Sequence, residues 1–140
     1  MERQFELRIR GRALIGMAMW LLTVPFPWVL GSVMAAAIHE LGHLAVLWIV
    51  ECSVRSVEID LGGAVIRSGP LEDREELWCA LSGPLAGLLV CLFWRRFPEA
   101  AVCAGVQTLF NLIPLYPLDG GRVWRALRNI CCKPGQKGVQ

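Results

Sequence analysis

The sequence predicts a mainly α-helical, polytopic membrane protein with about four transmembrane helices and a small membrane-surface β-sheet, formed by residues 5–10 and 54–66. Composition is the first reason: of 140 residues, 55% are hydrophobic and 19% are charged. This excludes a disordered chain and exceeds what one small soluble core can bury. The second reason is that residues 13–38, 77–94 and 100–118 contain no Asp, Glu, Lys, Arg or His. The third is strand-like alternation outside these runs.

The N-terminal part predicts a strand followed by two helices. Residues 5–10 alternate apolar and polar side chains, as an amphipathic strand does. The apolar run 13–24 would be about 18 Å long as a helix, so it must tilt, extend or pack against a neighbour to cross a bilayer. Two prolines predict a turn at 25–27, and a second helix should run from about residue 28 to residue 50.

A hairpin and a third helix should follow. Residues 57–61 alternate strictly, Gly62-Gly63 supplies a turn, and residues 64–66 return as the second strand. Acidic residues within 73–76 suit the first turn of a helix, because the N-terminus of a helix carries partial positive charge. The apolar run 77–94 continues that helix.

The fourth apolar run begins at residue 100 and is interrupted. Two prolines and two glycines within 111–121 cannot continue an ordinary helix. Irregular backbone at membrane depth is tolerated only inside the protein or along a cavity. After Gly121 a short amphipathic helix should lie on the cytoplasmic surface. Its apolar face would hold Val123, Leu127 and Ile130, with Arg122, Arg125 and Arg128 elsewhere.

Charge is distributed unevenly along the chain: both ends are basic, and residues 51–76 are acidic. Cytoplasmic loops are enriched in Lys and Arg, so we expect both termini in the cytoplasm and an even number of crossings. The basic residues flank apolar runs and form no separate domain, so nucleic-acid binding is not expected. We expect one membrane-embedded domain over residues 1–140, with a core at 5–130 and a flexible tail at 133–140.

The strongest signal is the segment His39-Glu40-Leu41-Gly42-His43, which holds the only two histidines of the chain. Histidines four residues apart share one face of a helix and can bind one metal ion. Glu40, next to the first histidine, can reach a metal-bound water. These polar residues interrupt a membrane helix, where a charge costs at least about 2.5–3.5 kcal/mol. A polar packing patch or a proton relay are the other interpretations.

Two histidines do not complete a catalytic zinc site, which usually has three protein ligands and one open position. Asp119 is the candidate for the third ligand, since it is the only acid after Glu99 and lies in the broken segment. Alone, it could equally be a turn residue of Asp-Gly-Gly.

Together, His39-Glu40-Leu41-Gly42-His43 and the later Asn111-Leu-Ile-Pro114-Leu-Tyr-Pro117-Leu-Asp119-Gly120-Gly121 resemble the intramembrane site-2 metalloproteases. The basic start and the helix before the histidine pair are most similar to the stage IV sporulation factor FB branch. The resemblance implies one zinc ion per chain bound by His39, His43 and Asp119. It also implies Glu40 as the catalytic base, and Asn111 close to the substrate backbone or the developing oxyanion.

The resemblance further implies hydrolysis of peptide bonds in membrane-associated proteins, such as a membrane-tethered sigma-factor precursor. It implies a place in the bacterial cytoplasmic membrane and a separate regulatory membrane protein. The alternative is a non-proteolytic metal-binding scaffold or a transporter-like protein. An intact Glu40 speaks against a scaffold, because a scaffold needs no base. Zinc that copurifies, together with cleavage of a membrane substrate, would discriminate between the two.

Overall fold

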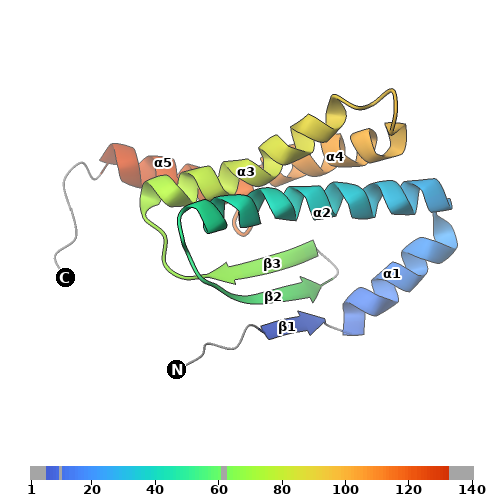
Figure 1. Cartoon of the computed structure of the whole chain (residues 1–140), viewed down its shortest axis with the longest axis horizontal. Helices are drawn as coiled ribbons and strands as arrows, with labels where there is room; N and C mark the ends of the chain where they lie inside the picture. Colours follow the sequence, from blue (N-terminus) through green and yellow to red (C-terminus); the bar gives the residue numbers. More distant parts are fainter. Residues whose placement is uncertain (1–5, 10, 61–62, 133–140) are drawn as a thin grey trace.

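The structure, a computed structural model, describes residues 6–9, 11–60 and 63–132 and is mainly α-helical with one small sheet (Figure 1). The predicted fold class is confirmed to this extent. The end residues of the predicted first strand, the hairpin turn at 61–62 and the tail at 133–140 lie outside the described residues.

Two helices joined by a proline turn form the N-terminal half. Helix α1 spans Gly11–Thr23 and helix α2 spans Phe26–Ile49. Helix α2 begins earlier than predicted, because Pro25 precedes its first residue and Pro27 lies in its first turn. The fixed φ angle of proline suits the first turn of a helix, where its missing N–H costs nothing.

A three-stranded sheet lies alongside the C-terminal half of α2, as Figure 1 shows. The chain turns back after α2 at Glu51, which has a left-handed conformation (φ 53°), and continues into β2, Val54–Asp60, and β3, Gly63–Ser68. These two strands form the predicted antiparallel hairpin. The N-terminal strand β1, Glu6–Ile9, pairs with β2 in parallel, so β2 is the central strand.

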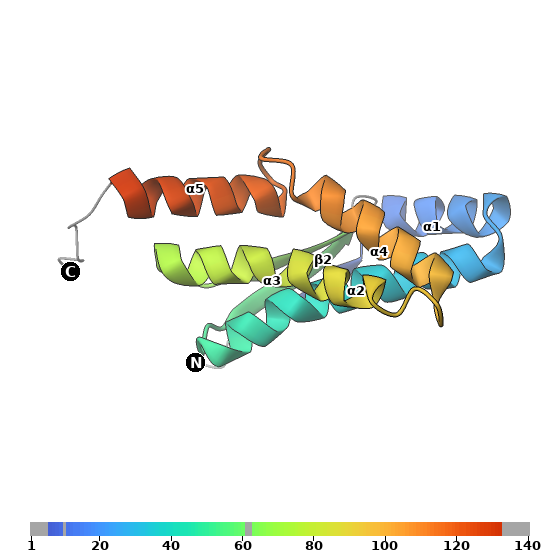
Figure 2. The same cartoon turned by 90° about the horizontal axis from the view of Figure 1, so that it is seen from above.

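Helix α3, Asp73–Cys91, packs against α2 and against helix α4, Pro98–Asn111, and α2 and α4 also contact each other. It runs opposite to both neighbours, which point the same way (Figures 1 and 2). Small residues let the helices approach closely: a Cβ atom at Gly42 would meet the backbone of Ser82. Alanines dominate the shared core for the same reason. That core comprises Ala35, Val90, Ala100 and Ala104.

Helix α5, Asp119–Cys132, follows the predicted break and packs on α3. Of the predicted apolar face, Val123 and Ile130 are half-buried and Leu127 is 41% exposed, while Ala126 is buried. Arg122 is half-buried and forms an ion pair with Glu76 of α3, which the sequence did not indicate.

The sequence predicts about four membrane-spanning helices, but one described helix is long enough to span a bilayer by itself. Among the described residues, only α2, with 24 residues, is long and apolar enough to cross a bilayer by itself. Helices α1 and α4 have 13 and 14 residues, about 20 Å each, which is shorter than the hydrocarbon core. The outer surfaces of α1 to α4 nevertheless expose many large apolar side chains, among them Leu22, Trp48 and Leu109. Soluble monomers rarely expose apolar surface of this extent.

Candidate metal centre

Helix α2 brings the two histidines to one buried face. His39 and His43 lie four residues apart, one turn of helix, and are 2% and 6% exposed. Their rings meet edge to face with centroids 4.9 Å apart. Both point toward α3 and the start of α5, so the predicted pair forms one site.

Asp119, the first residue of α5, completes the cluster. Its Oδ2 atom lies 3.0 Å from Nε2 of His39 and 3.3 Å from Nε2 of His43, and the two Nε2 atoms are 3.2 Å apart. Asp119 is 7% exposed. The structure thus brings together the three predicted ligands, although Asp119 lies 80 positions after His39 in the sequence.

The hydrogen bonding of this cluster fits a cation. Nδ1 of His43 lies 2.7 Å from the carbonyl oxygen of Cys79, so it carries the proton and leaves a lone pair on Nε2. That lone pair, Nε2 of His39 and Oδ2 of Asp119 converge on one point. A positive ion at this point would be bound by all three atoms once His39 carries its proton on Nδ1.

The spacing of the three atoms fits zinc. Ligand atoms about 2.0–2.1 Å from a tetrahedral zinc ion lie about 3.3 Å from one another. The three separations in the cluster are 3.0, 3.2 and 3.3 Å. Two imidazoles and a carboxylate are also a donor set that zinc accepts, and three protein ligands leave a fourth position open.

Helix α3 supplies no ligand but shapes the site. A Cβ atom at Gly83 would collide with Nε2 of both histidines, so only glycine lets α3 pass this close. The carbonyl of Cys79, one turn earlier, fixes the ring of His43. Neither role was found from the sequence, where the spacing of Gly83 and Gly87 indicates only close helix packing.

Two further predicted residues border the cluster. Asn111, the last residue of α4, has its side-chain nitrogen 3.2 Å from Nε2 of His39. Glu40 is half-buried and follows His39 directly in α2. It makes no hydrogen bond or ion pair with any described residue, so its carboxylate is free to contact a ligand. Glu99, the nearest preceding acid in the sequence, is about 18 Å along α4 from Asn111 and so lies far from the cluster.

An ion pair that the sequence did not indicate links the cluster to α3. Arg122 Nε donates to Glu76 Oε1 at 2.8 Å, and Arg122 Nη1 lies 3.5 Å from Asp119 Oδ1. Burial lowers the pKa of Arg122, but the ion pair with Glu76 and the contact with Cys79 together raise it by more, so the pKa lies above its usual value.

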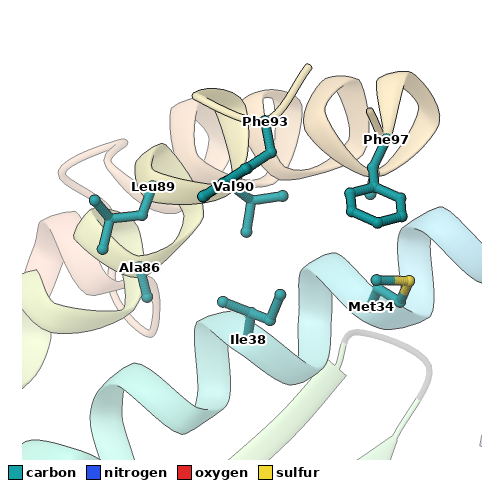
Figure 3. A pocket seen from close by; sticks show the side chains of 8 residues that line it. Met34, Ile38, Ala86, Leu89, Val90, Phe93 and Phe97 are labelled. Carbon is teal, nitrogen blue, oxygen red and sulfur yellow. The ribbon is translucent and has the colours of Figure 1, made fainter. Parts of the chain in front are cut away.

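An apolar cavity of about 360 Å³ lies between α2 and α3 (Figure 3). Met34 and Ile38 of α2 face it from one side, and Phe93 and Phe97 from the other. None of the three cluster residues lines it.

No protein-family model matches the sequence, and no curated protein matches it. The structure is similar to that of a site-2 protease from Methanocaldococcus jannaschii, with a TM-score of 0.62 and 20% sequence identity. The match covers 92% of this chain and 68% of the other. It supports a site-2 protease fold for this chain and gives no support to the sporulation branch in particular.

Proposed function

We propose that this chain is an intramembrane zinc metalloprotease that hydrolyses peptide bonds of membrane-associated proteins. The observation that carries the proposal is the buried cluster of His39, His43 and Asp119 with Glu40 beside it. The two histidines and Glu40 belong to α2, a helix with an apolar outer surface. The fold similarity to a site-2 protease supports the same conclusion.

Each polar residue of the site has a separate role in this proposal. A zinc ion held by His39, His43 and Asp119 would polarise the scissile carbonyl and lower the pKa of water at the site. Glu40 accepts a proton from the attacking water and delivers it to the leaving amine. Asn111 donates from its side-chain amide to the substrate backbone or to the oxyanion as charge develops.

The substrate would be an extended segment of a membrane protein. A helical segment hides its carbonyls in its own hydrogen bonds, so it must unwind before it is cut. Because β2 is paired on both sides, β3 offers the free edge of the hairpin to which such a segment can add as a strand. The apolar cavity between α2 and α3 can receive an apolar side chain of that segment.

The proposed topology has four crossings and both termini in the cytoplasm of a bacterium. The parallel direction of α2 and α4 supports it, because it lets the histidine pair and Asp119 reach the same depth. The parallel pairing of β1 with β2 requires the chain to return to one side after α1 and α2. We also propose that the substrate is a membrane-tethered regulator, such as a sigma-factor precursor. A separate membrane protein would regulate the cleavage.

The test is a reconstituted cleavage assay. The purified protein should contain one zinc ion per chain and cut a single-span model substrate at a bond that mass spectrometry places within or beside the span. Removal of zinc with a chelator should stop cleavage, and added zinc should restore it. Stoichiometric zinc without cleavage of any of a panel of single-span substrates would favour the metal-binding scaffold.

A further inference from the structure

We propose that Arg122 is a positioning residue that fixes the orientation of Asp119 and thereby sets the zinc affinity of the site. This inference rests on the proposed function, because it assumes that Asp119 is a metal ligand. It assigns a role to an arginine to which the sequence analysis gave none.

The two carboxylate oxygens of Asp119 face different partners. Oδ2 lies 3.0 Å from Nε2 of His39, inside the cluster, and Oδ1 lies 3.5 Å from Nη1 of Arg122. Rotation of the carboxylate would move Oδ1 toward the histidines and break the contact with Arg122. A cation at Oδ1 therefore favours binding of the metal through one oxygen, Oδ2.

Arg122 is itself held from another helix. Its Nε donates to Oε1 of Glu76 at 2.8 Å, and the two side chains are 26% and 29% exposed. Nη2 lies 3.7 Å from Sγ of Cys79. The planar guanidinium thus has a fixed direction, which a lysine in its place could not reproduce, because an ammonium is a point charge on a flexible stem.

The first two turns of α3 therefore orient two of the three ligands. The carbonyl of Cys79 fixes His43 directly, and Glu76 fixes Asp119 through Arg122. Groups that orient metal ligands in this way typically change metal affinity about 10- to 100-fold when they are removed. We expect that range for the loss of Arg122.

The experiment measures zinc affinity by competition with a chelator, for the wild type and for Arg122→Gln, Arg122→Lys and Glu76→Gln. Arg122→Gln should raise the zinc Kd about 10- to 100-fold. The zinc Kd of Arg122→Lys should lie between those of Arg122→Gln and the wild type, because lysine keeps the positive charge but lacks the planar guanidinium. Glu76→Gln should weaken binding in the same direction, since it loosens Arg122 without touching the cluster.

Arg125→Gln is the matched control. Arg125 lies on the same helix, with its guanidinium 4.8 Å from the ring centre of Tyr116, and has no contact with Asp119. Its zinc Kd should equal that of the wild type. The absorption spectrum of the cobalt-substituted protein adds a readout of ligand geometry, and it should change in Arg122→Gln and stay unchanged in Arg125→Gln.

The outcomes separate this inference from the proposed function. A wild-type protein that fails to bind zinc would refute the proposed metal site, and the role of Arg122 with it. Tight zinc binding by the wild type, with the same Kd and cobalt spectrum in Arg122→Gln, would overturn the role of Arg122 alone. If Arg122→Gln does not fold, Glu76→Gln and Arg122→Lys decide by the same two measurements.

Discussion

Asn111 ends α4 with its side-chain nitrogen 3.2 Å from Nε2 of His39, although 72 positions separate the two residues. The helix break after Asn111 allows this arrangement, because it ends α4 at the depth of the histidines and starts α5 with Asp119 at the same place. One interruption of the fourth apolar run therefore delivers two polar side chains to the site.

Glu40→Gln should leave zinc bound and lower the cleavage rate about 10²- to 10⁴-fold, the usual contribution of a general base. The substitution keeps the size of the side chain and removes only the carboxylate that accepts the proton. Zinc content and single-turnover cleavage are the measurements. Glu99→Gln, at the far end of α4, should cleave normally. Near wild-type cleavage by zinc-loaded Glu40→Gln would exclude Glu40 as the base.

Asp119→Ala should lose zinc more severely than any substitution of Arg122, because it removes an anionic ligand and not a group that orients one. Chelator competition measures the zinc Kd. The control is Asp73→Ala, which breaks another contact between α3 and α5, the 2.8 Å hydrogen bond from Asn129. Zinc retained by Asp119→Ala at wild-type affinity would show that the third ligand is another group.

Gly83→Ala should abolish zinc binding and lower the unfolding temperature, because the added Cβ would overlap Nε2 of His39 and of His43. At Gly105 the same substitution would place the Cβ 3.6 Å from Sγ of Cys91, an ordinary contact. Gly105→Ala should therefore be neutral, or stabilising by up to about 1 kcal/mol through helix propensity. Thermal unfolding and zinc content distinguish the two, and equal behaviour would contradict the close approach of α3.

Labelling of single cysteines should reveal the topology. In a background without the six native cysteines, we expect Arg96→Cys to react with an impermeant reagent added outside intact cells. Ser53→Cys should react only after permeabilisation. Both positions are exposed in the structure. Reaction of Ser53→Cys from outside would invert the topology, and reaction of both from one side would show that α3 does not cross.

The sequence predicted the side chains of the site better than the backbone around them. His39, His43 and Asp119 carry a recognisable pattern, and the structure places their ligand atoms together. The close approach at Gly83 and the hydrogen bond to the Cys79 carbonyl have no such pattern in the sequence, because both depend on where α3 crosses α2. The ion pair of Arg122 with Glu76 was not predicted for a related reason: helix periodicity describes one helix and not the acid that a neighbouring helix presents.

The elements were predicted closely where local signals exist. Alternation predicted the first two strands, the Gly62-Gly63 turn predicted the third, and prolines and glycines located the turn before α2 and the break before α5. The parallel pairing of β1 with β2 was not predicted, because nothing in residues 6–9 specifies a partner so far along the chain. The number of crossings could not be read from lengths, since α1 and α4 are each shorter than a bilayer core.

The parallel pairing of β1 with β2 also fixes an order of events during synthesis. Glu6 pairs with Ser56, so the first strand leaves the ribosome long before its partner exists. Until both intervening helices have been made and inserted, β1 is an open edge that can bind the wrong strand.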